Sequence, residues 1–306
     1  PFVEGPCIVI SNASKWAWVK EPIPHFDLMI IDDANAISES KFMQISGLAD
    51  RYVLIGDYNH PPPITRSDTR RWTSEPIGPH HSCIHTSPYR YPQAYQEIWK
   101  KSQRIPQDTL DVIQGSLYPR NPIEAAREKR RLHIHEEVTA PLWSAIAQGS
   151  SLVMAELPQA YTGSEDIELA SWIAQNIKML LQHKSTIEDS RMGGTLNPAK
   201  IGVVCTDHAQ VHSVEQQLGS LSTQIHIDVP FHYRSQERAL IFAFHPLTGL
   251  LSPNRYHWDS ALLSQVITRH RVACVLVSRK LDLSRPQGKR PANVEEDRSV
   301  DGYYAH

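Results

Sequence analysis

The sequence has few cysteines and no long apolar run, and both absences narrow its class. Its four cysteines, Cys7, Cys83, Cys205 and Cys274, are far apart and form no C-x-x-C pair. A disulfide framework or a zinc site is therefore not indicated, and a reducing, intracellular compartment fits best, cytoplasmic or, in a eukaryote, nuclear. No run approaches the ~18 apolar residues of a membrane span, and no signal peptide opens the chain. We expect a soluble protein without a membrane partner.

The sequence also has no large excess of positive or of negative charge. The chain has 306 residues with 31 Lys and Arg against 33 Asp and Glu, so its formal net charge is −2. This balance produces no global field that would indicate nucleic acid, although a local groove can still be basic. The length is sufficient for two domains of ordinary size, each with its own core.

Continuous apolar runs recur along the chain. They cover residues 7–11, 28–32, 52–56, 200–206, 239–245 and 272–278. Runs without polar alternation are typical of strands that are buried on both faces, as in the parallel sheets of α/β proteins. Helical periodicity follows at residues 164–183, with Ser164 as the expected N-cap, and at residues 207–220, which end near a glycine suited to a C-cap. The sequence therefore predicts the α/β class.

Two adjacent carboxylates, Asp32 and Asp33, follow one of these runs in the stretch HFDLMIIDDANAIS. Two like charges in a low-dielectric site repel each other, so the pair either faces water or has a partner. Open α/β sheets bind ligands at the carboxyl ends of their strands, where an aspartate commonly holds Mg²⁺ on nucleotide phosphates. Further along, YVLIGDYNHPPPI places Asp57 after a second strand. The two stretches together favour a metal and phosphate site.

At these residues the chain resembles the superfamily-one helicases of the Upf/Sen-like branch, which are P-loop NTPases. IIDDANA and LIGDYNHPPP are similar to helicase motifs II and III, and SPYRYP at 87–92 resembles the element that opens the second RecA-like domain. Later elements up to motif VI are matched by IGVVCTDHAQV at 201–211, FHYRSQERALIFAF at 231–244 and SQVITRHRVACVLVS at 264–278. An ordered set of motifs is hard to obtain by chance.

The resemblance implies a RecA-like P-loop NTPase architecture with parallel sheets, one partial and one complete. Residues 1–85 are expected to be the C-terminal part of the first RecA-like domain, and residues 86–284 the second. A Pro- and Arg-rich connecting segment is expected at residues 61–131, and the polar tail at 285–306 has no expected fixed structure. The Walker A pattern G-x-x-x-x-G-K-[ST] is absent. An N-terminal segment that carries it is expected to be missing, so this chain alone should hydrolyse little ATP.

The resemblance also implies catalytic residues. Asp32 matches the ligand of Mg²⁺, and Asp33 matches the carboxylate that orients the attacking water. Arg90 and Arg269 match arginines that reach from the second domain to the γ-phosphate of ATP, where they stabilise charge that develops in the transition state. Closure of the two domains around ATP would couple hydrolysis to movement along single-stranded DNA or RNA.

Other positions match the family in binding or coupling roles. The nucleotide-binding and coupling positions are Asp57, His60, Tyr89 and Glu237. The nucleic-acid contacts are Ser11, Asn12 and Thr206, where a strand would lie along both domains and be bound mainly through its phosphates.

Departures from the family pattern leave two other hypotheses open. Asp33 replaces the motif II glutamate, His60 and Ala36 replace glutamines, and Ala239 replaces an aspartate. The chain could therefore be a catalytically decayed module that binds nucleic acid or serves as a scaffold. A metal-dependent phosphoesterase built on Asp32, Asp33 and His60 is the third hypothesis, and it would release phosphate from a diester without nucleotide.

Overall fold

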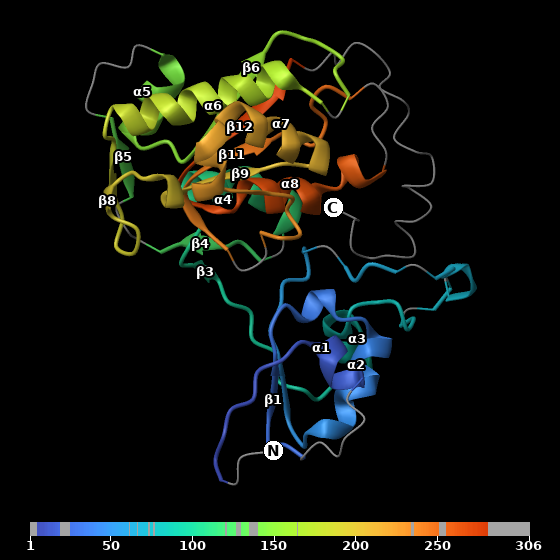
Figure 1. Cartoon of the computed structure of the whole chain (residues 1–306). Helices are drawn as coiled ribbons and strands as arrows, with labels where there is room; N and C mark the ends of the chain where they lie inside the picture. The colour runs from blue at the N-terminus through green and yellow to red at the C-terminus, as the bar shows by residue number, and fades with distance from the viewer. Residues whose placement is uncertain are drawn as a thin grey trace. The chain divides into compact units, whose positions relative to one another are not determined.

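The computed structural model of the chain contains two compact units (Figure 1). The described residues are 5–18, 25–60, 62–65, 67–72, 74–75, 77–119, 121–126, 130–134, 140–163, 165–233, 236–250 and 255–280. The N-terminal unit extends to Glu97 and the C-terminal unit begins at Ile98, later than the expected division between residues 85 and 86. The reason is helix α3 (Cys83–Arg90), whose Cys83 and Ile84 pack in the N-terminal core. The predicted tail and Ser164 lie outside the described residues.

A five-stranded parallel sheet forms the centre of the C-terminal unit. Its strand order is β10-β9-β11-β12-β6, and every neighbouring pair is parallel. The bounds are β6 Leu152–Leu157, β9 Ile201–Val204, β10 His226–Asp228, β11 Arg238–Phe244 and β12 His270–Arg279. The sheet confirms the α/β class and is consistent with a RecA-like fold. β6 was not expected, because Glu156 interrupts its apolar run, as suits an edge strand.

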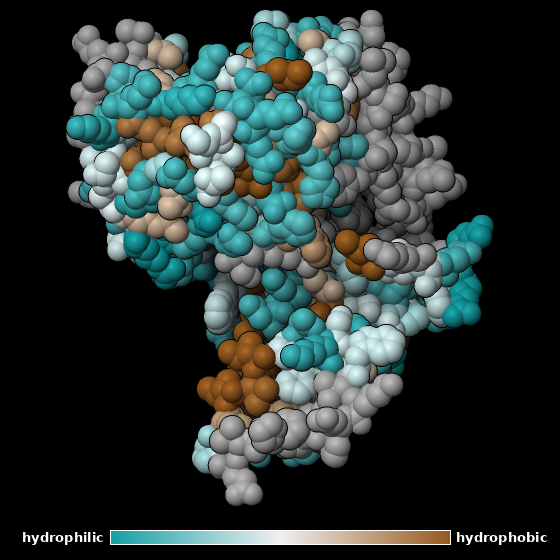
Figure 2. All heavy atoms as spheres, in the orientation of Figure 1, coloured by the Kyte–Doolittle hydropathy of each residue, from teal (hydrophilic) through white to brown (hydrophobic). Residues whose placement is uncertain are grey.

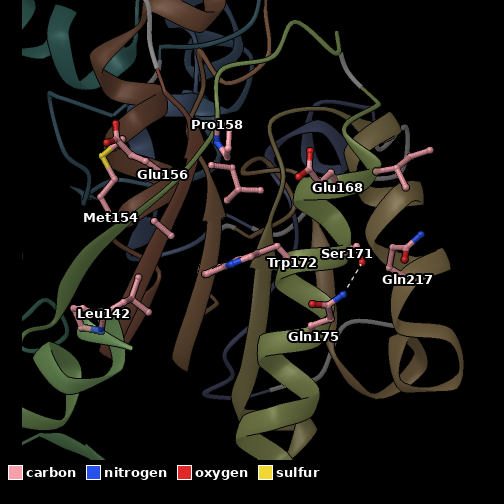
Figure 3. A pocket seen from close by; sticks show the side chains of 13 residues that line it. Leu142, Met154, Glu156, Pro158, Glu168, Ser171, Trp172, Gln175 and Gln217 are labelled. Carbon is pink, nitrogen blue, oxygen red and sulfur yellow. Dashed lines mark hydrogen bonds between the residues drawn. The ribbon is translucent and has the colours of Figure 1, made fainter. Parts of the chain in front are cut away.

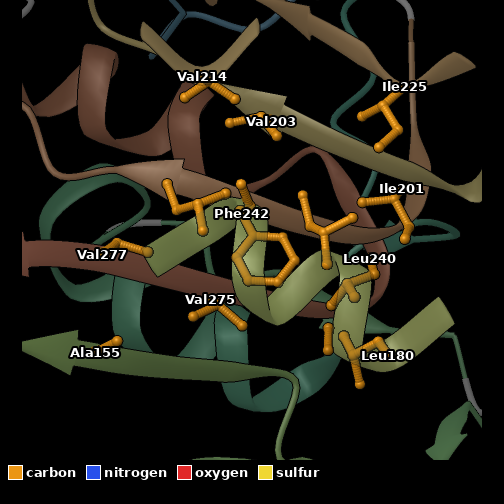
Figure 4. Close-up of a cluster of buried hydrophobic side chains, with 14 of the residues drawn as sticks. Ala155, Leu180, Ile201, Val203, Val214, Ile225, Leu240, Phe242, Val275 and Val277 are labelled. Carbon is orange, nitrogen blue, oxygen red and sulfur yellow. The ribbon is translucent and has the colours of Figure 1, made fainter. Parts of the chain in front are cut away.

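Helices cover both faces of this sheet, as the continuous apolar runs predicted. Phe242 and Val275 point to the core shared with α5 (Pro141–Gln148), α6 (Ile167–Gln182) and α7 (His208–Leu218), as Figure 4 shows. The alternate residues Ile241, Ala243 and Cys274 point to a second core with α4 (Gln107–Leu117) and α8 (Ser260–Ile267). Successive side chains of a strand point to opposite faces, so each strand contributes to two cores.

Aspartate side chains begin the two predicted helices. Asp166 Oδ1 accepts a hydrogen bond from the backbone N of Leu169 at 3.0 Å and so begins α6. Asp207 does the same for Gln210 at 3.0 Å in α7, whose C-cap is Gly219 with a positive φ of 62°. The expected glycine C-cap of α7 is therefore confirmed.

The N-terminal unit contains a parallel pair, β1 (Met29–Ile31) and β2 (Tyr52–Leu54), covered by helices on one side. Ile31 packs there against α1 (Ala13–Trp18), α2 (Glu39–Ile45) and α3. The prediction that these strands are buried on both faces is wrong for the described residues, because Ile30 is 61 % and Val53 is 43 % exposed. Figure 2 shows apolar side chains gathered on the strand side of this unit.

Two further expectations are wrong. Residues 7–11 form no strand, and Ile8 and Ile10 are more than nine-tenths exposed. The segment at 61–131 is not only a connection, because α4 packs in a core of the C-terminal unit.

The other elements are η1 Ala34–Ala36, η2 Ser46–Leu48, η3 Arg70–Trp72, β3 Lys101–Ser102, β4 Glu124–Ala125, β5 Arg131–His133, β7 Thr186–Glu188, β8 Gly194–Thr195, η4 Pro198–Lys200, η5 Gly219–Gln224 and η6 Arg255–Trp258. None of the described helices is long and apolar enough to cross a membrane.

Candidate functional site

The aspartate pair lies in the turn that follows β1. Asp32 is exposed, and its Oδ1 accepts a hydrogen bond from the backbone N of Asp33 at 3.0 Å. Asp33 is half-buried and has a left-handed backbone conformation (φ 50°), which aspartate tolerates better than most residues. Asp32 therefore faces water, which answers the question of how two adjacent carboxylates are accommodated.

The end of β2 adjoins this turn. The backbone N of Ile55 donates to the O of Ile31 at 2.9 Å, and the N of Ala34 donates to the O of Ile55 at 2.8 Å. A Cβ atom on Gly56 would lie 3.0 Å from both the N and the Oδ1 of Asn35, so the two backbones approach closely. The stretches that resemble motifs II and III thus meet at the carboxyl ends of two paired parallel strands.

Asp57 and His60 form a compact turn after β2. Asp57 Oδ1 accepts a hydrogen bond from the backbone N of Asn59 at 2.8 Å, and His60 Nε2 lies 3.8 Å from Asp57 Oδ2. Both side chains are half-buried. The ring of Tyr58 contacts the ring of His85 on α3 with centroids 4.8 Å apart, and burial raises the pKa of Tyr58.

Arg90 lies in the N-terminal unit, at the end of α3, rather than in the second domain as expected. Its Nε forms an ion pair with Oε1 of Glu39, which is only 3 % exposed. Thr86 Oγ1 donates a hydrogen bond to the other oxygen of Glu39. No sequence pattern indicates this pair, because Glu39 and Arg90 come together only through the packing of α2 against α3. Tyr89 next to it is 64 % exposed.

Glu237 and Arg269 come together in the C-terminal unit, at the amino ends of β11 and β12. The backbone N of Arg238 donates to the O of Arg269 at 3.0 Å. Arg269 is only 3 % exposed, and its Nε donates to the backbone O of Gln265 at 3.1 Å. Glu237 is half-buried, with Oε1 3.5 Å from Nη1 of Arg271 and 3.9 Å from Nη1 of Arg191.

Asp189 and Arg271 are part of this edge, and sequence reasoning missed both. Arg271 is fully buried and donates to Asp189 through Nε and Nη2, and Arg130 Nε lies 3.3 Å from Asp189 Oδ1. Burial alone would raise the pKa of Asp189, but the hydrogen bonds from Arg271 and from backbone N–H groups outweigh it and lower that pKa. Arg271 stands in the motif-like stretch TRHR and could have been noticed there. Its partner Asp189 follows β7, which is distant in the sequence.

The expected nucleic-acid contacts lie at separate places. Thr206 is 5 % exposed, and its N and Oγ1 donate to Oε1 of Gln210 at 2.8 and 3.0 Å, so the side chain binds within the protein. Ser11 and Asn12 are exposed, and Oδ1 of Asn12 accepts a hydrogen bond from the N of Lys15 at 2.7 Å at the start of α1.

A groove of about 1170 Å³ lies on the C-terminal unit. Figure 3 shows Met154 of the edge strand β6 and Trp172 of α6 along it. No predicted site residue lines it. Within the part of the chain that the structure describes, no three His, Cys, Asp or Glu side chains are grouped so that they could hold a metal ion by themselves.

These features define an α/β protein with carboxylates after paired parallel strands in one unit and a charged strand edge in the other. No protein-family model matches the chain, and no curated protein matches it. Among solved structures, the helicase of PRRSV is similar with a TM-score of 0.39 and 11 % identity, over 83 % of this chain and 35 % of that one. The arterivirus nonstructural protein 10 (helicase) in complex with DNA is similar with a TM-score of 0.39 and 11 % identity, over 86 % of this chain and 41 % of that one. This chain thus spans less than half of either helicase.

Proposed function

We propose that this chain is the C-terminal portion of an ATP-dependent helicase or translocase of superfamily one, an intracellular protein that moves on single-stranded DNA or RNA. One observation carries the proposal: the stretches that resemble motifs II and III lie against each other, with Asp32, Asp33 and Asp57 following the two strand ends. Parallel α/β sheets bind their ligands at such ends. Glu237 and Arg269, which match motifs V and VI, are likewise neighbours within the C-terminal unit.

The side chains fit ATP and Mg²⁺ by their chemistry. Asp32 presents an exposed carboxylate, the type of ligand that Mg²⁺ binds together with water and nucleotide phosphates. The metal would neutralise phosphate charge when it is bound with ATP. Asp33 has the role of orienting water, and its side chain is one carbon shorter than the glutamate of the family. Asp57, His60 and Tyr89 would bind or couple to the nucleotide.

The open face of β1 and β2 supports a further N-terminal segment. Ile30 and Val53 lie opposite each other on neighbouring parallel strands and are exposed, whereas such sheets normally have both faces covered. The segment that would carry the Walker A loop is the proposed cover. Strands and a helix from it would bury this apolar surface and complete the first RecA-like domain.

The test uses the chain together with its upstream coding region. We expect ATP hydrolysis that increases when single-stranded DNA or RNA is added, and we expect Asp32→Asn to reduce kcat by roughly 100-fold or more. Asp27→Asn is the matched control, because Asp27 is an exposed aspartate just before β1 and belongs to no motif. Absence of strand-stimulated hydrolysis, or equal activity in the Asp32 variant, would refute the proposed function.

A decayed module that binds nucleic acid without hydrolysis is the second candidate. The burial of Arg269, which is 3 % exposed, favours it, because an arginine that stabilises a γ-phosphate has to reach the nucleotide. Fluorescence anisotropy with a labelled single strand separates the two. Binding without hydrolysis in the longer protein would support the decayed module.

A further inference from the structure

The edge strand β6 has an open outer side. On its inner side the backbone O of Ser151 and of Leu157 accept hydrogen bonds from β12 at 2.7 and 2.8 Å. Backbone groups of successive strand residues point to alternate sides, so the N–H and C=O groups of Met154 and Glu156 point outward. Within the part of the chain that the structure describes, no strand pairs with this outer side. Such an edge is a template for one further strand.

The side chains of β6 alternate between the two faces of the sheet. Ala155 and Leu157 point into the core that the sheet shares with α5, α6 and α7. Met154 and Glu156 therefore point to the opposite face, and both are exposed. A strand added beside β6 would have every second side chain on the α6 face and the others on the face of Glu156.

On the α6 face, an added strand would meet the groove of the C-terminal unit. Trp172 extends from α6 into this groove, Ile167 there is 59 % exposed, and Leu142 of α5 lines it as well (Figure 3). The volume of about 1170 Å³ exceeds the roughly 300 to 1,000 Å³ of small-molecule pockets. The groove therefore suits the apolar side chains of a peptide segment.

The charged side chains that line the groove are both negative. They belong to Glu156 and Glu168, and no Lys, Arg or His is among the described residues that line it. Oε2 of Glu168 lies 2.9 Å from Nη2 of Arg279, which compensates its charge. Glu156 is exposed and has no such ion pair among the described residues. A basic side chain on its face of an added strand would supply the opposite charge.

We propose that β6 and this groove bind an extended segment of a partner protein in which apolar residues alternate with Lys or Arg. Hydrogen bonds between the two backbones would provide affinity, and the alternate side chains would provide selectivity, against Trp172 on one face and Glu156 on the other. A second copy of β6, with the sequence LVMAEL, would bring no basic residue to Glu156. The site is independent of the proposed ATPase.

Fluorescence anisotropy with this chain and a labelled peptide of about ten residues, in which valine alternates with arginine, measures the binding. The matched peptide has the same residues in one apolar and one basic block, and we expect it to bind at least about tenfold more weakly. Glu156→Lys should weaken binding of the alternating peptide by roughly fivefold or more. Glu188→Lys, which changes an exposed glutamate on β7, should alter it by less than about twofold.

Met154→Pro tests the backbone contacts. Proline removes the outward N–H group and leaves the hydrogen bonds to β12 in place, as edge strands tolerate. We expect binding at least roughly tenfold weaker, whereas Met154→Ala, which keeps the N–H group, should bind within about threefold of the unmodified chain. Thermal unfolding checks that both variants fold. If Met154→Pro does not fold, the result with Glu156→Lys decides.

The proposal is wrong if the two peptides bind equally well. Equal losses in Glu156→Lys and Glu188→Lys would also overturn it, because they indicate a diffuse charge effect. A dimer of the chain in analytical ultracentrifugation that Met154→Pro dissociates would mean that a second copy occupies the edge, and the partner segment would be rejected. The proposed function is judged separately, by hydrolysis stimulated by single-stranded nucleic acid in the longer protein.

Discussion

Arg271 and Asp189 form a two-point ion pair in which neither side chain is exposed to solvent. Nη2 of Arg271 lies 3.0 Å from Oδ1 of Asp189, and Nε lies 3.1 Å from Oδ2. Removing one partner of a buried pair leaves the other charge without compensation. We therefore expect Asp189→Asn to lower the free energy of unfolding by about 3 to 5 kcal/mol, measured by urea denaturation. Glu188→Gln, an exposed neighbour, should stay within about 0.5 kcal/mol. A loss below about 1 kcal/mol in Asp189→Asn would contradict this account.

His270 should make the stability depend on pH. Its ring is fully buried and its Nε2 lies 3.0 Å from Thr109 Oγ1, and burial lowers its pKa from 6.5 to about 4. The unfolded chain therefore binds the proton at a higher pH than the folded chain does, so this contribution is present above pH 6.5 and is lost as the pH falls towards 4. It amounts to about 3 kcal/mol at most.

Urea denaturation at several pH values between 4 and 7 measures this contribution. Other carboxylates and histidines titrate in the same window, so the comparison is with His270→Gln, which should show a shallower loss of stability on acidification. His212→Gln, a substitution of an exposed histidine on α7, should leave the slope unchanged. Identical slopes in the His270 variant and the unmodified chain would mean that His270 does not resist protonation.

Gly56→Ala should disturb the junction of the two strand ends in the N-terminal unit. The new Cβ would lie 3.0 Å from two atoms of Asn35 and 3.2 Å from Cδ1 of Ile84, so the backbone after β1 has to move. We expect a loss of about 1 to 3 kcal/mol in unfolding free energy. Gly47→Ala is the control, because nothing lies within 4 Å of its added Cβ. Equal stability of the two variants would show that the strand ends yield easily.

Thiol labelling should distinguish Cys7 from the other three cysteines. Cys7 is exposed, whereas Cys83, Cys205 and Cys274 are buried, and burial raises the pKa of Cys83 to about 12. The thiolate is the reactive form, so we expect one fast-reacting thiol with Ellman's reagent in the native protein and no fast phase in Cys7→Ser. A second fast thiol would mean that one of the cores opens readily.

Much of the sheet in the C-terminal unit could be predicted from the sequence. β9 and most of β11 and β12 coincide with uninterrupted apolar runs, because strands covered on both faces need apolar residues at most positions. β6 was not predicted, because a charged residue interrupts its apolar run. As an edge strand it keeps Met154 and Glu156 exposed, and Glu156 ends its apolar run after Ala155.

The site was only partly predictable, and the reason lies in long-range packing. Motif-like stretches located Asp32 and Asp57, whose positions follow from the strands before them. The partners of Arg90 and Arg271 could not be read in the same way, because Glu39 and Asp189 are distant in sequence and carry no local pattern. The burial of individual side chains could not be predicted either. Thr206 and Arg269 stand in the expected stretches, yet both side chains are almost entirely inside the protein.

The sequence by itself determined the α/β class, the principal strands and the order of the motif-like stretches, because hydrophobic periodicity and local residue types are properties of short segments. Only the tertiary structure decided which charges are buried, which arginine is accessible and which face of a strand pair is open. Those properties depend on desolvation and on contacts between segments far apart in the chain. Arg191 is an example, since its backbone N donates a hydrogen bond to Asp189 while its side chain stays exposed near Glu237.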